Sequence, residues 1–151
     1  MDLVSYEITK ADIDSINQVL AKLLNSVALD IVVVGDEGGR LITFSPYGED
    51  MFNVAQRFCV ISASVLGALD QLDNLLQSKS NFFTEGLNGS IYIKLSNSNF
   101  FISVKFGRNV MLGTVKLFVD RAAKELEPVF IKIRESSSKK FSGIKFDMLE
   151  I

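Results

Sequence analysis

Four consecutive β-branched residues, Ile31, Val32, Val33 and Val34, constrain the fold of this 151-residue chain more than any other feature. Successive side chains of a strand point to opposite faces of its sheet, and a strand with one face in water alternates apolar and polar residues. This run does not alternate, so we expect both faces of its strand to be buried. A sheet buried on both sides needs helices on each side. The run therefore predicts three layers with the sheet in the middle.

Helical and strand periods follow one another in a definite order. Thr9 and Asp12 form a capping-box pattern ahead of an apolar helical stripe, which predicts a helix over residues 10–27. The Gly-rich run 35–39 predicts a tight turn between two strands. The remaining patterns predict, in chain order, these elements: strands at 31–34 and 40–45, a long helix over 52–76, strands at 90–95, 100–106 and 110–113, and a helix from residue 115.

Two segments lack a regular period. Residues 78–89 are rich in turn formers, and we expect an irregular connection there. After a domain at 1–134, serines and lysines precede several apolar residues, which predicts a polar hinge and an apolar C-terminal tail at 135–151. Pro128 lacks a backbone donor, so we expect it to kink or end the last helix.

The order αββαβββα predicts an α/β (α+β) protein of three layers, α/β/α, around a five-stranded antiparallel meander sheet. Short connections within each group of strands favour antiparallel neighbours. We expect the first and last helices to cover one face of the sheet, and the helix at 52–76 to cover the other.

Composition and charge exclude several classes of function. Sixteen basic and eighteen acidic residues leave a formal charge of −2, too little positive charge for a phosphate backbone, so we expect no nucleic-acid partner. The N-terminus lacks the form of a secretion signal, and the single cysteine, Cys59, has no disulfide partner within the chain; both features favour the cytoplasm. The longest uncharged apolar run, 58–69, is shorter than the roughly 20 residues of a membrane helix, so we expect no membrane span.

No set of catalytic or metal-binding residues emerges from the sequence. The chain has no histidine, the commonest general acid/base and metal ligand. Cys59 lies in a helical apolar stripe, where a thiol is far more often a small core residue than a nucleophile. The run 35–39 lacks the ending of a phosphate-binding loop, and Asp36 with Glu37 makes a poor cation site. We therefore expect a protein with no active site, metal or cofactor of its own.

The helix expected at 52–76 carries small residues that favour a protein interface. Gly67 costs roughly 1 kcal/mol relative to alanine in a helix interior, and close approach of another helix would offset that cost. Val60 and Ala63 lie off the main apolar stripe, and their exposure would create an apolar patch typical of an interface. The alternative is that the small residues fit this helix against its own sheet.

The strand expected at 90–95 begins the second half of the sheet. If it lies at the edge, little beyond Lys94 protects it from pairing with another chain. Pairing with its own copy, together with contact between two copies of the helix at 52–76, would form a two-fold homodimer with one continuous sheet. The alternative is an edge covered within the monomer.

Two motifs at the start of the last helix resemble a known family. They are Leu112-Gly113-x-Val115-Lys116-Leu117 and Arg121-Ala122-Ala123. Both are similar to the last strand and closing helix of the roadblock/dynein light-chain family, and more narrowly of its bacterial MglB group, which regulates a small Ras-like GTPase. The likeness covers roughly residues 10–134 and itself implies a three-layer fold.

The resemblance implies a regulator with no catalysis of its own. Roadblock proteins are dimers that serve as platforms for small GTPases or motor subunits. An MglB-like homodimer would bind the switch regions of an MglA-like GTPase and promote GTP hydrolysis, in bacterial cell polarity or motility. A scaffold that recruits partners without altering hydrolysis is one alternative. A small-molecule sensor, which requires an internal cavity, is another.

The small-residue segment of the long helix is similar to the GTPase-contacting helix of this family. It therefore supplies five candidates for partner or dimer contact, namely Arg57, Val60, Ala63, Ser64 and Gly67. Which contact each residue serves stays open, and Arg57 is interpreted as a surface charge rather than an arginine finger. The resemblance also implies that the tail docks on the GTPase through Phe141, Ile144, Phe146 and Leu149. A tail folded back on its own domain is an equal alternative.

Overall fold

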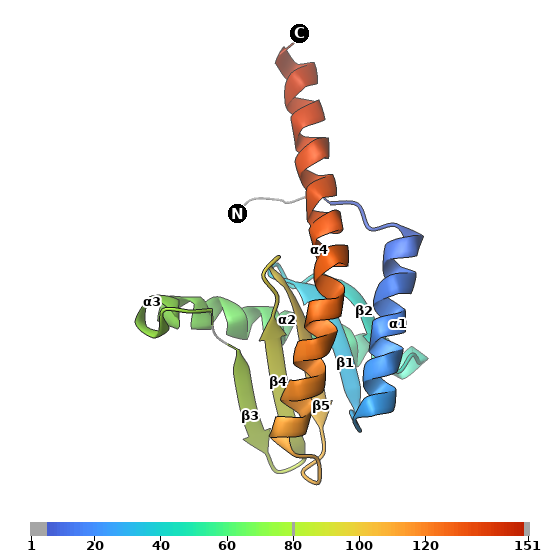
Figure 1. The fold of residues 1–151 in the computed structure, drawn as a ribbon, viewed down its shortest axis with the longest axis vertical. Helices are drawn as coiled ribbons and strands as arrows, with labels where there is room; N and C mark the ends of the chain where they lie inside the picture. The colour runs from blue at the N-terminus through green and yellow to red at the C-terminus, as the bar shows by residue number, and fades with distance from the viewer. Residues whose placement is uncertain (1–5, 80, 150–151) are drawn as a thin grey trace.

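A five-stranded sheet lies between two layers of helices (Figure 1). The computed structural model describes residues 6–79 and 81–149, and beyond Ser136 only the backbone of the last helix. The elements in chain order are α1 (Lys10–Ser26), β1 (Ile31–Asp36), β2 (Leu41–Ser45), α2 (Glu49–Leu69), the 3-10 turn η1 (Asp70–Leu72), α3 (Asp73–Leu76), β3 (Phe82–Gly86), β4 (Gly89–Leu95), β5 (Phe100–Phe106) and α4 (Leu112–Leu149). The three-layer α/β/α arrangement expected from the sequence is confirmed.

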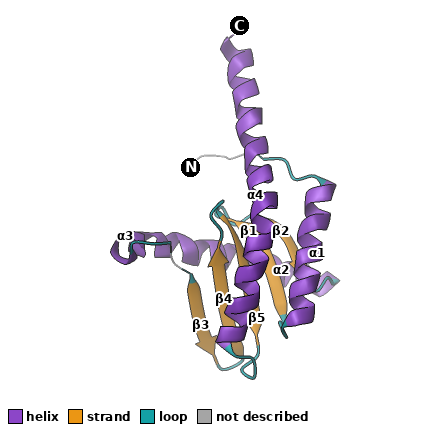
Figure 2. Ribbon diagram, in the orientation of Figure 1, coloured by secondary structure: helices purple, strands orange, loops and turns teal. Residues whose placement is uncertain are grey.

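The strands are antiparallel and lie side by side in the order β2-β1-β5-β4-β3 (Figure 2). The central pair is β1 and β5, in which Val32 lies opposite Val104 and Val34 lies opposite Ile102. Each edge strand is paired on one side only within the described part of the chain, β2 with β1 and β3 with β4.

Both faces of β1 are buried, as the run of β-branched residues predicts. Val32 and Val34 belong to the core beneath α1 and α4, whereas Ile31 and Val33 belong to the core beneath α2. The first core is filled by large side chains, among them Tyr92, Phe100, Phe106, Leu126 and Phe130. In the second core, α2 contributes mainly small side chains. The backbone of helix α2 can therefore lie close to the sheet.

One expected strand is wrong. Residues 110–113 form a turn and the first residues of α4, and the N–H of Val110 donates to the carbonyl of Gly107 at 3.1 Å. The fifth strand is instead β3, inside the segment 78–89 that was expected to be irregular. Every residue of β3 after Phe82 is exposed. Such a strand lacks the apolar alternation by which a half-buried strand is recognised.

The strand at 90–95 is not an edge strand, so the condition for its pairing with another chain is not met. Strand β4 is paired on both sides, because Ile91 lies opposite Lys105 of β5 and opposite Thr84 of β3. The long helix expected over 52–76 is interrupted: α2 ends at Leu69, and η1 and α3 continue the chain to Leu76.

The last helix, α4, is continuous over 38 residues and extends well beyond the sheet (Figure 1). Pro128 lies inside α4 and does not end it. Leu126 and Phe130 are buried on either side of Pro128, and their packing holds the helix in place. The polar segment after residue 135 was expected to be a hinge, but its described backbone continues the helix to Leu149. The division of the chain into 1–134 and 135–151 stays a prediction.

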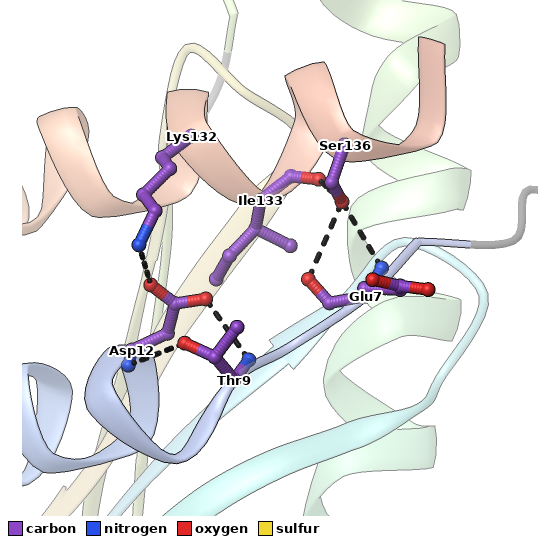
Figure 3. Close-up of polar contacts among 6 residues, drawn as sticks. All are labelled: Glu7, Thr9, Asp12, Lys132, Ile133 and Ser136. Carbon is purple, nitrogen blue, oxygen red and sulfur yellow. Dashed lines mark hydrogen bonds and ion pairs between the residues drawn. The ribbon is translucent and has the colours of Figure 1, made fainter. Parts of the chain in front are cut away.

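A polar junction fixes α4 to the start of α1 (Figure 3). The capping box is confirmed, because Thr9 Oγ1 accepts from the N–H of Asp12 at 3.1 Å and Asp12 Oδ2 accepts from the N–H of Thr9 at 3.0 Å. Asp12 also accepts a hydrogen bond from Lys132 of α4 at 3.0 Å. The N–H of Glu7 donates to Ser136 Oγ at 3.0 Å. These bonds join the chain before α1 to α4 at the point where α4 leaves the sheet.

The hydrogen bonds at this junction lower the pKa of Asp12. Burial by itself would raise the pKa, but the hydrogen bonds from Thr9 and the bond and charge of Lys132 outweigh burial and lower it. A carboxyl with a lowered pKa in the folded state stabilises that state above its unfolded pKa of about 3.9, and this contribution is lost as the pH falls through the lower folded value.

We predict that Asp12→Asn lowers the free energy of unfolding at pH 6 and that the difference from the wild type shrinks at pH 3. Asparagine keeps an acceptor for the N–H of Thr9 but has no charge for Lys132. Urea unfolding at both pH values measures the two free energies. Asp14→Asn, at an exposed position of the same helix, is the control and should lack this pattern. A difference that is equal at both pH values would contradict the role of the charge.

Candidate protein-interaction surface

Helix α2 has an inner face that packs on the sheet and an outer face that no described residue covers. The buried inner residues are Ala55, Cys59, Ser62, Ala63 and Leu66. Ser62 is fully buried, and its hydroxyl oxygen accepts a hydrogen bond from Ser103 of β5 at 2.8 Å. This bond satisfies two polar groups inside the core and fixes the height of α2 above the sheet.

Four of the five candidate contact residues share the outer face. Arg57, Val60, Ser64 and Gly67 follow one another at intervals of three or four residues, so they form one line along the helix, here called the α2 stripe. The Val60 side chain is 55% exposed, as expected. Apart from its two chain neighbours and the local helix backbone, no described atom lies within 4 Å of the position that a Cβ on Gly67 would occupy. The described chain therefore gives Gly67 no packing role.

The expected exposure of Ala63 is wrong. Ala63 is only 9% exposed and packs in the core beneath α2. Residue 63 lies one position after Ser62, and the two share the inner face, because the buried side of α2 is wide enough to include both. Ala63 is thus one of the small residues that fit α2 against its own sheet.

Several exposed apolar residues of α2 and of the segment that follows it were not predicted as contacts. They are Phe52, Val54 and Ile61 of α2, then Leu72, Leu75 and Leu76 of η1 and α3. Ile61 is four residues after Arg57, so helical spacing alone could have placed it beside the stripe. A contiguous exposed apolar surface is typical of a protein interface.

Length and composition alone would also permit this region to cross a membrane. The stretch Glu49–Leu76 contains a segment with a mean hydropathy of 1.4. In the structure the inner side of this stretch packs on the sheet, which is the arrangement of a helix that covers a core. The absence of a membrane span stays a prediction.

Strand β3 offers a second exposed surface next to α3. Its backbone pairs with β4 on one side only within the described chain. The Phe83 side chain is 41% exposed. An exposed edge strand with an apolar side chain is prone to pair with another strand. The edge available for pairing is therefore β3, one strand further out than the segment 90–95 that the sequence indicated.

Comparisons with known proteins agree with this geometry. No family model matches the sequence. An uncharacterised protein of Aquifex aeolicus is 25% identical over 146 residues, which are 92% of this chain and 87% of that protein. MglB of Myxococcus xanthus superimposes with a TM-score of 0.72 at 24% identity, over 84% of this chain and 96% of MglB. A roadblock/LC7 domain of Streptomyces avermitilis superimposes with a TM-score of 0.67 at 11% identity, over 76% of this chain and 96% of the domain.

The chain has the roadblock/LC7 fold. It resembles MglB within that fold, as the motifs in the last helix indicate. Helices α1 and α4 cover one face of the sheet, and α2 covers the other.

Large aromatic side chains fill the described interior. Five aromatic side chains, Tyr92, Phe100, Phe101, Phe106 and Phe130, are at most 2% exposed. Phe100 and Phe130 stack with their ring centroids 4.8 Å apart. This packing agrees with the expectation that the many phenylalanines fill the interior. A small-molecule sensor would instead need a cavity there.

The turn at residues 35–39 is a hairpin turn, as expected. Asp36 closes it by accepting hydrogen bonds from the N–H groups of Gly38 at 2.9 Å and Arg40 at 3.0 Å. The Tyr6 hydroxyl donates to the same carboxylate, and burial together with Asp36 raises the pKa of Tyr6. The carboxylate of Asp36 thus has a structural role in holding the turn and the N-terminal segment together.

The tail candidates Phe141, Ile144, Phe146 and Leu149 have side chains outside the described part of the chain. Their positions along the backbone belong to α4. Docking of the tail on a partner stays a prediction.

Cys59 is a core residue, as the sequence predicts. It is fully buried, and its Sγ lies 3.4 Å from the carbonyl oxygen of Gly39, to which it donates. Burial, with a smaller effect from the charge of Asp36, raises the pKa of the Cys59 thiol to about 12. At pH 8 only roughly 1 in 10,000 such thiols is ionised, against about a quarter of free thiols.

We predict that the folded protein does not react with Ellman's reagent at pH 8. The thiolate is the reactive species, and Cys59 provides almost none of it. Absorbance should show one reacting thiol per chain only after unfolding in urea. Ser64→Cys places a thiol on the exposed side of the same helix, and this variant should react within minutes while folded. Equal rates for the wild type and this variant would contradict the buried position of Cys59.

Proposed function

We propose that this chain is an MglB-like regulator of a Ras-like small GTPase. It acts in the cytoplasm as a homodimer, binds the switch regions of an MglA-like partner and promotes GTP hydrolysis, in bacterial cell polarity or motility. The structural likeness to MglB and the motifs in α4 support this proposal.

The α2 stripe carries the proposal. A helix gains nothing within its own domain from an exposed glycine, which costs roughly 1 kcal/mol relative to alanine. Gly67 and Ser64 instead allow the backbone of another molecule to approach α2 closely. Val60 adds apolar area beside them, and Arg57 adds a positive charge. Together these residues suit contact with a macromolecular partner along the length of the helix.

Dimerisation is proposed through the edge strand β3 and the exposed apolar residues of α3. Pairing of two β3 strands across a two-fold axis would satisfy the unpaired backbone groups of both edges. It would also join two five-stranded sheets into one and place the two copies of α2 on the same face. A GTPase could then contact one or both helices.

The mechanism rests on positioning. Phosphoryl transfer is accelerated chiefly by holding the nucleophile and charged groups in place around the γ-phosphate. By binding the switch regions, the roadblock dimer would hold the polar residues of the GTPase in that arrangement. Groups of this chain need not reach the nucleotide, which is consistent with Arg57 as a surface charge. The C-terminal end of α4, with its apolar tail residues, is proposed to add a contact to the same GTPase.

We predict that this protein accelerates phosphate release from its cognate GTPase and that Gly67→Arg removes the acceleration. The arginine side chain would occupy the space through which the partner approaches. Gly113→Arg is the matched control, since Gly113 is also an exposed helical glycine with no atom within 4 Å of its Cβ position. The measurement is phosphate release under single-turnover conditions, and circular dichroism shows whether each variant is folded.

The outcome separates two functions. Binding without acceleration would contradict the activator and leave the scaffold that recruits partners. Retained acceleration in Gly67→Arg, or equal loss in Gly113→Arg, would contradict the assignment of the α2 stripe.

We predict that the protein is a dimer in solution and that Phe83→Asp weakens the dimer by roughly tenfold or more. A carboxylate at an edge that must pair with its copy places two like charges close together. Analytical ultracentrifugation over a range of concentrations measures the dissociation constant. Met111→Asp changes an exposed residue that belongs to no strand and directly precedes α4, and it should leave the constant unchanged. A monomeric wild type would contradict the homodimer.

A further inference from the structure

The second sheet edge, β2, lies in a groove that the proposed function does not use. The groove has a volume of about 940 Å³ and is bordered by α1, β2 and the N-terminal half of α2. We call it the β2 groove. It is lined by Ile13, Asn17, residues 39–44, Tyr47, Phe52, Gln56, Arg57, Val60 and Ile61. Arg57 and Val60 thus border both the α2 stripe and the β2 groove, whereas the residues of β2 belong to the groove alone.

The floor of the β2 groove has backbone groups available for pairing. Strand β2 pairs with β1 on one side, and along residues 6–79 and 81–149 no strand pairs with its other side. In a strand, alternate residues direct their N–H and C=O groups to opposite neighbours. The five residues of β2 span about 17 Å, which matches an extended segment of the same length.

Aromatic side chains form one end of the groove. Tyr47 is 87% exposed and stacks on Phe44 with ring centroids 5.1 Å apart. The ring of Phe52 is tilted toward that of Phe44, with centroids 6.2 Å apart. A large exposed aromatic side chain with its ring already held in place is a typical anchor of a binding surface, because little conformational freedom is lost when a partner covers it.

The charges of the groove have one sign. Arg40 and Arg57 are both exposed, and no aspartate or glutamate lines the groove. Among the described residues, neither guanidinium forms an ion pair. Arg40 lies over the ring of Tyr6 at 4.9 Å from its centroid, which holds the charge at the start of β2. The carboxylate of Asp36, which accepts from the N–H of Arg40, belongs to the turn before β2 and does not line the groove. Two arginines in a lining that contains no acidic residue are complementary to carboxylates.

We propose that the β2 groove binds an extended, acidic and apolar segment of a partner protein, which adds to the sheet as a strand beside β2. The backbone of the segment pairs with β2, its apolar side chains cover Phe44, Tyr47 and Ile61, and its carboxylates lie near Arg40 and Arg57. In strand addition of this kind, backbone hydrogen bonds provide affinity for the peptide, and contacts with every second side chain select its sequence. This inference goes beyond the proposed function, which requires neither β2 nor its groove.

The unpaired edge favours a peptide over other occupants. A row of backbone donors and acceptors is satisfied by a molecule that carries a matching row, and a peptide in the extended conformation is such a molecule. A lipid or a compact small molecule would cover the aromatic side chains but leave the edge of β2 unpaired.

The test is an NMR titration of the full-length ¹⁵N-labelled protein with three capped synthetic peptides of seven residues. The first alternates valine and threonine between two terminal glutamates. The second has lysines in place of the glutamates, and the third has N-methylated residues that cannot donate backbone hydrogen bonds. We expect the first peptide to shift the amide signals of Leu41–Ser45 and of Tyr47. The affinities of the other two peptides should be lower by roughly tenfold or more.

Matched variants test whether the charge of Arg40 contributes to peptide binding. Arg40→Glu should weaken the acidic peptide and favour the lysine peptide, whereas Arg108→Glu, at an exposed position in the turn after β5, should change neither affinity. Tyr47→Ser should weaken all binding while leaving the folded spectrum intact. Gly67→Arg should leave peptide binding unchanged, so that failure of the proposed function and failure of this inference are distinguishable.

Three results would overturn the proposal. The first is the absence of shifts at β2 with the acidic peptide at millimolar concentration. The second is equal affinity for the acidic, lysine and N-methylated peptides, which would indicate apolar adsorption only. The third is concentration-dependent broadening of the β2 signals without peptide, which would show that a second copy of this chain occupies the groove.

Discussion

The burial of β1 and β5 on both faces is the constraint on which the rest of the structure depends. Val32 and Val34 require the layer of α1 and α4, and Ile31 and Val33 require α2. Once both layers are in place, the central strands have no solvent face, and the edge strands and the outer sides of the helices are left to meet another molecule. The surfaces described above, the α2 stripe, the β3 edge and the β2 groove, are all of this kind.

Much of the fold could be predicted because the spacing of apolar residues along a helix or strand indicates which of its faces is buried. The helices at Lys10–Ser26 and Glu49–Leu69 and the strands β1, β4 and β5 all have apolar patterns that match their packing. Strand β3 could not be recognised in the same way. It lies at the edge with most of its residues exposed, and it is a strand because it pairs with β4, which is a contact between segments rather than a local property.

The candidate site, too, could be predicted only in part. Helical spacing places Arg57, Val60, Ser64 and Gly67 on one face, and the structure confirms that this face is exposed. Spacing did not place Ala63 correctly, because the width of the buried side of α2 depends on how close the helix lies to the sheet. That distance is set by small inner residues and by the bond between Ser62 and Ser103. The β2 groove could not be predicted either, since it forms only where three separate elements meet in space.

The separation of the two sides of α2 has a consequence for how such proteins diverge. The inner residues of α2 contribute to the folding free energy through their contacts in the core, whereas substitutions on its outer side usually change that free energy by less than about 0.5 kcal/mol. Mutations that retune recognition can therefore accumulate on the outer side without a compensating change in the core. One architecture can in this way acquire new binding specificities while its sequence drifts to the low identities seen between this chain and proteins of the same shape.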